Sequence, residues 1–554
     1  MKQILKQREI LLFGTVVFLI FGVPDFTAGD YYEDLSRELK TFNELYKELV
    51  VNYVDHVNPD ALLEAGINGM LETLDPYTVY LEDEEQHGIR TLTQGKYGGV
   101  GIRLGVRKDT LTVIAPIEEG PADREGVLPG DRIIQIDTVG TAEMRLSKAA
   151  SLMRGEAGTQ VTLTILRPGV DKRIPFVLTR EDIVVHDLAF AELVTDGIAY
   201  LKLTSFSRNS AEELRKAVER LGPDSIQAII LDLRDNPGGL LTAALDVVEL
   251  FVSPGKEVLT TRGRMEETNR TFTTETDPVV PEDLPMAVLV NEGSASASEI
   301  VSGVLQDLDR AAILGTDTFG KGLVQSVIPL NQHASLKVTT AKYYIPSGRL
   351  IQKEDYFDKE VVTVRSERDS VYYTNNHRKV YGGGGITPDI IVRRDSIPKV
   401  IREIWAENHF FHYAVSYHNQ HPGEVWPFSI TERQLDEFIS YLDTKGFEFI
   451  TKSSKLFRDF KATLDSSVIS EAQVDKAIGT LESYLSARES WQDNRRIRRW
   501  LRWELEQEFA EVYGGEDAHI RTAIRHDETY QTALGLLQNQ TRYRRQLGYA
   551  KIEE

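Results

Sequence analysis

The chain has 554 residues, no cysteine and a formal net charge of −21. The lack of cysteine excludes disulfides, cysteine nucleophiles and cysteine zinc sites. The acidic balance argues against nucleic acid as a partner, because phosphate binding needs a basic surface. The length exceeds what one hydrophobic core normally serves, so it predicts three or four domains.

The N-terminus has the pattern of an export signal. Three basic residues precede an apolar run over residues 10–23. This run is short for a membrane span and of the right length for a signal-peptide core. Small residues at 27–29 offer a cleavage point, so residues 1–29 are predicted to be a signal peptide. The alternative is an uncleaved inner-membrane anchor formed by residues 10–23. Either interpretation predicts export to the periplasm or cell envelope.

Residues 30–92 are predicted to form a helical module with no chemistry of its own. A second helical pattern there runs from Ala61 to Leu74 and ends at Asp75-Pro76. The first pattern has apolar residues at helical spacing: Leu39, Phe42, Leu45, Tyr46 and Leu49.

Residues 93–182 change to short β-runs and turns and resemble a PDZ domain, most strongly from Gly120 to Asp137. A glycine-rich loop leads into the first strand: Tyr97, Gly98, Gly99, Val100, Gly101 and Ile102. Its spacing is not that of a P-loop, so phosphate binding is rejected. In a PDZ domain such a loop offers backbone N–H groups to a terminal carboxylate, and the next strand pairs with the peptide. The alternative is a small β-barrel without a ligand.

Residues 183–395 alternate between strand and helix patterns, which predicts a sheet with helices packed on it. The predicted strands are 198–203, 228–233, 287–291 and 312–314, and the predicted helices are 210–221, 240–251 and 296–308. Further β-runs follow at 324–330 and 336–345. The polar residues 254–285 suit a hairpin or lid, and residues 353–380 form a second polar excursion.

The stretch 288–300 passes from an apolar strand through small residues into a helix. Such a turn exposes a side chain at a helix N-terminus, where free N–H groups favour negative charge. If that side chain is a hydroxyl nucleophile, its oxyanion forms beside those donors. Ser296 is the candidate. Taken alone, the stretch is also explained by a serine N-cap.

Lys321 lies between Gly320 and Gly322 after an apolar strand. In an apolar neighbourhood a lysine ammonium gives up its proton more readily, so lysine can act as a general base. Serine–lysine pairs are an established alternative to the histidine triad. Gln325 lies four residues on and is a candidate to orient the lysine. The alternative is an ordinary surface lysine near a turn.

Together these pieces resemble the carboxyl-terminal processing, or tail-specific, serine peptidases over roughly residues 31–393. The motifs that carry the resemblance are 232–240 (DLRDNPGGL), 291–300 (NEGSASASEI), 319–322 (FGKG) with Gln325, 344–349 (YIPSGR) with Ile351 and Gln352, and 385–389 (GITPD).

The resemblance implies acyl transfer by Ser296 as nucleophile, Lys321 as base and Gln325 as supporting amide. It also implies an oxyanion hole from the N–H of Ala297 and one from Gly238 or Gly239, with the choice left open. The implied fold is α/β: a crotonase/Clp-like peptidase core with an inserted PDZ β-domain. No cofactor and no metal is expected.

Histidines offer two alternatives. His409 with His412, and His418 with His421, have spacings that suggest a metal site, but their flanks are aromatic and no carboxylate has clear ligand spacing. A Ser-His-Asp triad would need a histidine from the core. The two available histidines, His186 and His333, lie in no recognisable motif.

Residues 396–554 are predicted to be an all-helical region outside the resemblance. Apolar stripes there suggest a homodimer contact or a surface for an adaptor protein; the alternative is a structural appendage. The N-terminal module is expected to pack on the peptidase core. The sequence therefore predicts an exported endopeptidase that binds free protein C-termini and cleaves near them. The competing hypothesis is a catalytically silent PDZ scaffold.

Overall fold

The computed structural model describes residues 26–82, 88, 91–107, 110–195, 197–332, 334–353, 370–393, 395–421, 429–463 and 471–549. The chain divides into two compact units at Tyr80–Leu81, and strand β1 (Val79–Glu82) spans this division. The predicted export segment, residues 10–23, lies outside the described residues. No described helix has both the length and the apolar character needed to cross a membrane.

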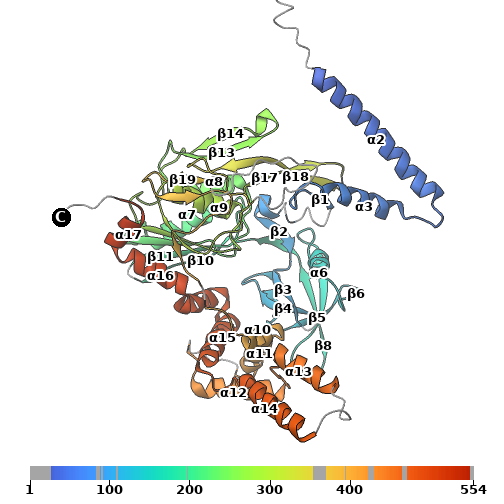
Figure 1. Cartoon of the computed structure of the whole chain (residues 1–554), viewed down its shortest axis with the longest axis vertical. Coiled ribbons are helices and arrows are strands. Elements are labelled where there is room, and N and C mark those ends of the chain that lie inside the picture. The colour runs from blue at the N-terminus through green and yellow to red at the C-terminus, as the bar shows by residue number, and fades with distance from the viewer. Residues whose placement is uncertain are drawn as a thin grey trace, which may run out of the picture. The chain divides into compact units, whose positions relative to one another are not determined.

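The first unit contains the predicted N-terminal helices, α2 (Phe26–Asn52) and α3 (Pro59–Leu71) (Figure 1). Helix α3 starts where the sequence provides a cap. The side chain of Asn58 accepts hydrogen bonds from the backbone N–H groups of Asp60 and Ala61, and Pro59 occupies the first helical position. This confirms an N-terminal helical segment.

The PDZ domain is confirmed as a small β-structure with two helices. Its main sheet has the order β3-β4-β5-β7-β8, so β3 is an edge strand. The strands are β2 (Lys96–Gly99), β3 (Ile102–Arg107), β4 (Thr110–Pro116), β5 (Arg132–Ile136), β6 (Val139–Gly140), β7 (Gln160–Leu166), β8 (Arg173–Thr179) and β9 (Glu181–Val184). The helices are α5 (Pro121–Arg124) and α6 (Leu146–Met153). Strands β2 and β9 pair with each other where the chain enters and leaves the PDZ domain.

The predicted peptidase core is built on a sheet of order β10-β11-β12-β15-β16-β21, parallel from β11 onward. Its strands are β10 (Leu188–Thr195), β11 (Ile198–Leu203), β12 (Ala228–Asp232), β15 (Met286–Val290), β16 (Ala312–Gly315) and β21 (Ile390–Ile391). The predicted helices are confirmed as α7 (Ser210–Leu221), α8 (Leu241–Glu249) and α9 (Ala297–Asp307), with a short helix η1 (Pro223–Ser225) after α7.

A second, antiparallel sheet lies beside this core. It contains β13 (Glu257–Gly263), β14 (Arg270–Thr273), β17 (Leu323–Pro329) and β18 (Ala334–Tyr344). Strands β13 and β14, joined through η2 (Glu266–Thr268), form the hairpin predicted within residues 254–285. Strands β19 (Val371–Tyr373) and β20 (Lys379–Tyr381) form a separate pair.

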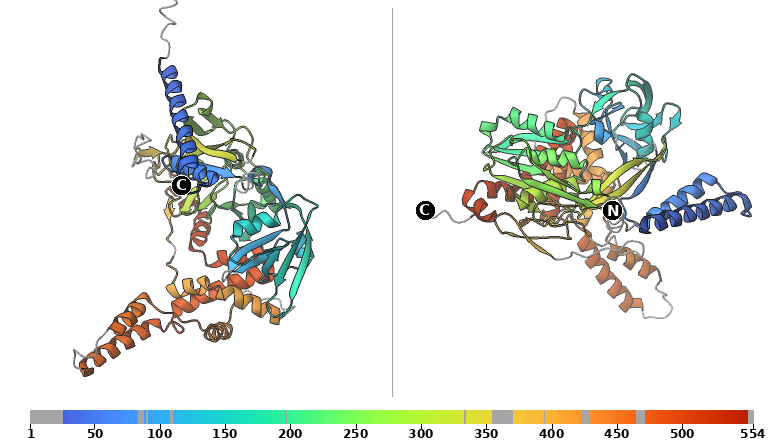
Figure 2. Two further views of the ribbon diagram at one scale, coloured as in Figure 1. Left: turned by 90° about the vertical axis from the view of Figure 1, so that its right-hand side faces the viewer. Right: turned by 90° about the horizontal axis from the view of Figure 1, so that it is seen from above.

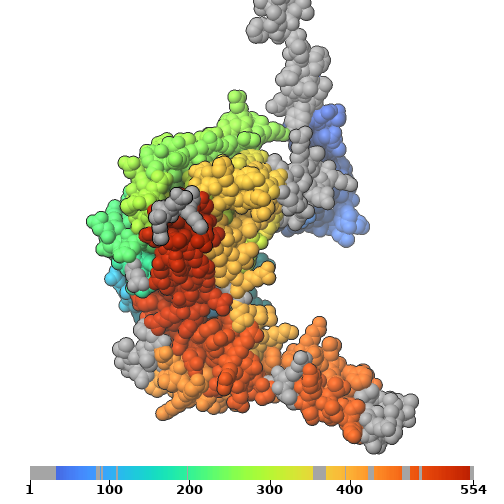
Figure 3. Space-filling view, turned by 60° about the vertical axis from the view of Figure 1, so that its left-hand side comes forward, coloured from blue at the N-terminus to red at the C-terminus, as the bar shows by residue number. Residues whose placement is uncertain are grey.

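Both faces of the core sheet are covered. On β15, Met286, Val288 and Val290 pack with α7, α8 and α9, whereas Ala287 and Leu289 pack on the opposite face. Successive side chains of a strand point to opposite faces, and here both faces are buried. This explains why the strands are apolar without interruption. The opposite face is covered by residues from the end of the chain: Ile520, Ile524, Tyr530, Ala533, Leu536, Leu537, Tyr543 and Leu547. They lie at the end of α15, in the short helix η4, in α16 (Glu528–Leu537), and in or just after α17 (Gln540–Gln546), drawn in red in Figure 3.

The rest of the C-terminal region is helical as predicted and has its own apolar core. Its helices are α10 (Lys399–Ala406), α11 (His409–Gln420), α12 (Glu432–Thr444), α13 (Lys452–Thr463), α14 (Glu471–Glu489) and α15 (Arg495–Ala523), followed by η4 (Ile524–His526). The predicted capping box from Thr431 to Gln434 begins α12. Helices α13 and α14 lie side by side, joined by an ion pair of 2.6 Å between Lys461 and Glu482 (Figure 2).

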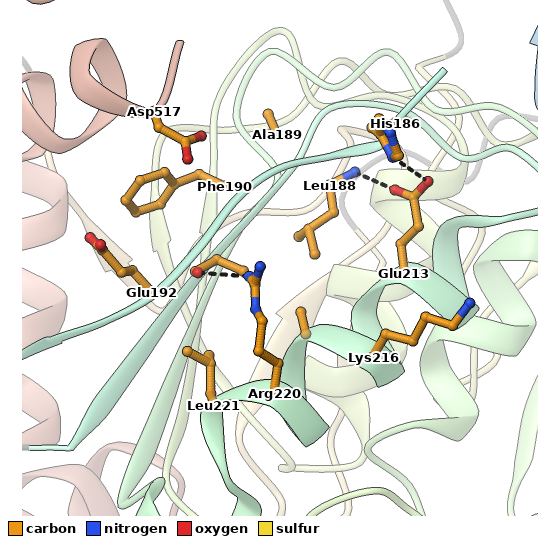
Figure 4. A pocket seen from close by; sticks show the side chains of 12 residues that line it. His186, Leu188, Ala189, Phe190, Glu192, Glu213, Lys216, Arg220, Leu221 and Asp517 are labelled. Atoms are coloured by element: carbon orange, nitrogen blue, oxygen red, sulfur yellow. Dashed lines mark hydrogen bonds and ion pairs between the residues drawn. The ribbon is translucent and has the colours of Figure 1, made fainter. Parts of the chain in front are cut away.

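The exposed edge strand β10 is protected by side chains of α7 (Figure 4). Glu213 accepts hydrogen bonds from the backbone N–H of Leu188, at 3.0 Å, and from that of Asp187. Arg220 donates to the carbonyl oxygen of Ala191 at 3.2 Å. Side chains that satisfy edge groups prevent further strands from pairing there. The cavity of about 680 Å³ along this strand therefore belongs to the protected edge of the sheet.

Candidate active site

The chain between β15 and α9 holds Ser296 in a strained conformation. Its φ and ψ are 54° and −110°, in the left-handed half of backbone space, which costs energy for a residue other than glycine. Ser296 is partly exposed, whereas Ser294 and Ser298 are fully buried. The hydroxyls of those two serines donate to the carbonyl oxygens of Leu233 and Asn236, each at 2.8 Å. Of the three serines, only Ser296 has its side chain at the surface.

Glu299 connects the serine turn to the lysine loop. This fully buried carboxylate accepts hydrogen bonds through Oε2 from the backbone N–H groups of Ser296, at 2.8 Å, and of Lys321, at 2.9 Å. Its Oε1 accepts from the Thr318 hydroxyl and from the Gly320 N–H. Burial raises the pKa of Glu299, and these four donors oppose that rise. One carboxylate thus holds Ser296 and Lys321 side by side.

The sequence analysis missed Glu299. The signal was present, because Ser296-x-x-Glu299 has the spacing of a capping box, in which the third helical residue accepts from the N-cap N–H. The hydrogen bonds from Thr318 and Gly320 could not be predicted from the sequence, because they depend on how the loop that carries these residues folds back onto Glu299.

We expect Glu299→Gln to lower kcat about 100-fold with a much smaller change in KM. The amide offers one acceptor oxygen where the carboxylate offers two, so the serine turn and lysine loop separate, and displacements of about 1 Å in an active site cost about this much. The check is steady-state peptide cleavage, with Glu292→Gln, an exposed glutamate of the same turn, as matched control. Equal losses in both variants would contradict the positioning role.

Tyr343 on β18 supports the same pair from another direction. Its fully buried side chain donates to the carbonyl oxygen of Ser296 at 3.2 Å and to that of Lys321. Gln325 lies on β17, at a bulge in its pairing with β18, and donates to the Thr339 hydroxyl at 3.4 Å. Its role in orienting Lys321 stays a prediction.

The turn with the two candidate oxyanion glycines is anchored by Asn236. Its side chain accepts from the Gly238 N–H at 2.9 Å and donates to the Leu203 carbonyl at 2.9 Å. The N–H of Gly238 is therefore occupied. Gly239 forms a parallel β-bridge with Phe206. In this bridge the residues on either side of Gly239 make the backbone hydrogen bonds to Phe206. The N–H of Gly239 itself therefore points away from Phe206.

The glycine turn lies directly against the start of α9. A Cβ built on Gly238, which has φ +98°, would come within 2.9 Å of the Ala297 backbone nitrogen and 2.7 Å of the Ala295 carbonyl oxygen. The space in front of the Ala297 N–H is thus open only because residue 238 is glycine. The same Cβ would lie 3.0 Å from the Cβ of Ser296, so the structure places the glycine turn at Gly238 directly beside Ser296 and Ala297.

A buried ion pair supports this turn from behind. Arg234 donates to Asp232 at 2.6 and 2.9 Å and to Asp527, the N-cap of α16. Burial alone would raise the pKa of Asp232, but Arg234 and Lys202 hold it below its usual value. The motif that carries the glycine turn is therefore tied to the C-terminal helical layer.

The predicted peptide-binding loop lines a cavity of about 200 Å³ in the PDZ domain. Five of the six predicted residues border it: Tyr97, Gly99, Val100, Gly101 and Ile102. The sixth, Gly98, lies against the neighbouring backbone and accepts from the Gly155 N–H at 3.2 Å. The opposite wall is helix α6 with Leu146, Ala150 and Met153. The cavity opens beside edge strand β3, where an extended peptide can pair.

The structure places three of the histidines named in these alternatives away from the serine turn. His409 is buried between the rings of Tyr441 and Phe447, and His418 packs edge-on against Tyr513. In the described part of the chain no group of three or more histidine, aspartate and glutamate side chains is arranged to hold a metal ion. His186 pairs with Glu213 at the β10 edge, and His333 lies outside the described residues.

Comparison with known proteins decides the family. Family models match residues 26–85 (activating protease CtpB N-terminal domain), 112–167 (PDZ domain), 197–363 (peptidase family S41) and 400–537 (probable PDZ-protease, C-terminal helical domain). The carboxy-terminal-processing protease of Bartonella bacilliformis is 36% identical over 394 residues, which cover 70% of this chain and 83% of that protein. The chain belongs to the carboxy-terminal-processing protease family.

A further relative agrees with this assignment. The carboxyl-terminal-processing protease of Synechocystis sp. is 39% identical over 304 residues, covering 54% of this chain and 70% of that protein. Among solved structures, the photosystem II D1 C-terminal processing protease is similar at 24% identity with a TM-score of 0.34, covering 64% of this chain and 88% of that one. The family models and the two named relatives make this protein a serine-type peptidase of the family, with a PDZ domain.

Two remaining motifs of the resemblance form the support beneath α9 in this processing protease. Arg349 is fully buried and donates to Asp307 and Gln306, each at 2.8 Å. Asp389 accepts from the Ile313 N–H at 2.8 Å and pairs with Arg378. These side chains contact one another rather than the serine turn, so their role is structural.

Proposed function

We propose that this protease cleaves proteins near their free C-termini with a Ser296–Lys321 dyad, through an acyl-enzyme. The observation that carries the proposal is the shared carboxylate of Glu299, which holds the backbones of both residues and keeps Ser296 in a strained, partly exposed conformation. Backbone strain at a position fixed by its surroundings is typical of functional sites.

In the proposed reaction, neutral Lys321 takes the hydroxyl proton of Ser296 while the serine oxygen attacks the peptide carbonyl carbon. The tetrahedral intermediate carries its negative charge on the former carbonyl oxygen. Collapse breaks the C–N bond, and the proton passes from Lys321 to the leaving amine. Water then attacks the ester, with Lys321 again removing a proton, and the serine hydroxyl is restored.

The oxyanion is held by the N–H groups of Ala297 and Gly239 in this proposal. Gly239 is preferred over Gly238 because Asn236 already accepts from the Gly238 N–H. The N-terminus of α9 adds its dipole at the same point. Backbone donors fixed in this way stabilise the intermediate without reorganising during the reaction.

The PDZ domain selects the substrate by its C-terminus. The loop around Gly101 presents backbone N–H groups to a terminal carboxylate, and the last apolar side chain enters the cavity beside Ala150. The preceding residues pair with β3 as an additional strand.

Amidating the C-terminus of a substrate peptide should raise KM about tenfold to 100-fold and leave kcat nearly unchanged. The amide removes a charge-assisted hydrogen bond but leaves the scissile bond unaltered. The measurement is cleavage of a matched pair of peptides that differ only in the terminal group. Ala150→Leu, which fills the cavity, should raise KM for the free-acid peptide. Equal KM values for both peptides would contradict tail recognition, while leaving the dyad assignment intact.

Export and self-association complete the proposal. Residues 1–29 direct the chain to the periplasm or cell envelope, with residues 10–23 as signal core or inner-membrane anchor.

A homodimer is supported by apolar side chains at helical spacing that α2 exposes: Leu35, Leu39, Phe42, Leu45 and Leu49. An adaptor protein would dock on α13 and α14, which expose Leu456, Phe460, Leu481 and Tyr484. A catalytically silent PDZ scaffold is the competing function, and it has no use for a strained, partly exposed Ser296.

A further inference from the structure

A second large cavity, of about 640 Å³, lies between the core sheet and the C-terminal helices. One wall comes from the ends of β11 and β12, and the other from α10, α15 and the start of α16. Its volume is in the range of ligand-binding pockets, and it opens outside the carboxyl ends of parallel strands, where α/β sheets commonly bind ligands. Neither the proposed dyad nor the peptide-binding loop of the PDZ domain lines it.

Aromatic rings dominate the helical wall. Three of the five tryptophans in the chain line the cavity: Trp405, Trp500 and Trp503. Tryptophan is the aromatic side chain that attracts cations most strongly. This surface already shows that preference, because the guanidinium of Arg499 stacks over the Trp503 ring at 5.1 Å. The indole Nε1–H of Trp500 is buried and meets no acceptor among the described residues.

Glu504 places an uncompensated carboxyl group among these rings. It is about nine-tenths buried, and it accepts a hydrogen bond from the Trp405 indole N–H at 3.0 Å. Burial, assisted by Glu508, raises the pKa of Glu504 to about 8, and no cation in the described part of the chain contributes to that shift. The two cations that line the cavity, Lys202 and Arg234, already face Asp232.

We propose that this cavity binds the arginine or lysine side chain of a protein segment, with the cation between Glu504 and the tryptophan rings. A peptide segment suits this wall, because an arginine or lysine side chain brings the cation that the tryptophan rings and Glu504 attract. The rim adds the exposed carboxylates Asp235, Glu292 and Glu528, which attract a basic segment. The proposal does not rest on cleavage at Ser296.

Cation binding at this site releases a proton. Near pH 7 Glu504 is mostly protonated, and pairing with a cation favours its carboxylate form. Affinity therefore rises as pH increases from 7 to 9. Other titratable groups face the same cavity: Tyr200, Lys202, Arg234, Asp235, Glu292, Asp395, His519, His526, Asp527 and Glu528. A Glu504→Gln variant separates the contribution of Glu504 from theirs.

The test uses the full-length protein and two blocked amino acids of nearly equal shape, N-acetyl-arginine methylamide and its uncharged citrulline analogue. Titration calorimetry in buffers of different ionisation enthalpy measures affinity and proton release, and tryptophan fluorescence reports on the site. We expect the arginine probe to bind at least about tenfold more tightly than the citrulline probe. Glu504→Gln should remove this preference and the proton release, whereas the remote variant Glu437→Gln should keep both.

Equal binding of the two probes, or no binding of either, would overturn the proposal. So would a preference for arginine that survives in Glu504→Gln. Spermidine tests the source of the cation: tighter binding of this polyamine than of the blocked arginine would reject a protein segment as ligand. Thermal unfolding of Glu504→Gln confirms that the variant is folded, because glutamine has nearly the shape of the protonated acid.

Discussion

Ser296→Ala should lower kcat for tail-peptide cleavage by at least about 10³-fold, with KM within a few-fold of the parent value. Removing the nucleophile of a serine peptidase leaves only the contributions of the oxyanion hole and substrate binding. The turn itself should persist, because its bonds come from the backbone N–H of Ser296 and from the hydroxyls of Ser294 and Ser298.

Lys321→Met should cause a loss of similar size, because methionine keeps the length of the side chain and removes the base. The two losses should not add in the double variant, since nucleophile and base act as a unit. Matched controls are Ser326→Ala and Lys337→Met, on β17 and β18. Cleavage by Ser296→Ala at the parent rate would contradict the assignment of the nucleophile.

Removing the end of the chain should unfold or aggregate the peptidase core. Truncation after His519 deletes Ile520, Ile524 and helices α16 and α17, which cover one whole face of the core sheet. Uncovered, that face presents contiguous apolar side chains of β11, β12, β15 and β16 to water. A truncation near residue 395 removes the same cover, so it cannot test for a dispensable appendage.

A point substitution measures this layer without deleting it. Leu536 is fully buried against the sheet, so Leu536→Ala should lower the free energy of unfolding by about 2–5 kcal/mol. Gln531→Ala, on the exposed side of the same helix, should change it by less than about 0.5 kcal/mol. Denaturant unfolding of both variants is the check. A soluble, fully active truncation after His519 would contradict the structural role of the layer.

The core sheet was predictable because its strands are short, apolar and separated by helix patterns. The strands at 198–203 and 228–233, and the helix at 210–221, lie within about one residue of their predicted ends. The cover of the second face was not predictable. Continuous apolar strands indicate that both faces are buried, but not that Tyr530 and Leu536, about 300 residues later than β12, do the covering.

The candidate site likewise has features that the sequence predicts and features that only the fold shows. Ser296 and Lys321 were predictable as candidates, because a strand–turn–helix and a glycine-flanked lysine are local patterns to which the family resemblance assigns roles. The preference for Gly239 over Gly238 was not, because it depends on the direction in which the Asn236 side chain points. The role of Glu299 required the fold as well, since its donors Thr318 and Gly320 come from a loop about twenty residues away.

Covalent labelling tests the central assignment most directly. The full-length protein would be treated with a fluorophosphonate, which phosphorylates activated serine nucleophiles, digested, and sequenced by tandem mass spectrometry. The account predicts a single modified residue, Ser296, with labelling abolished in Ser296→Ala and slowed by at least about 10²-fold in Lys321→Met. Modification of another serine at the parent rate, or unchanged labelling of Lys321→Met, would contradict a Ser296–Lys321 dyad.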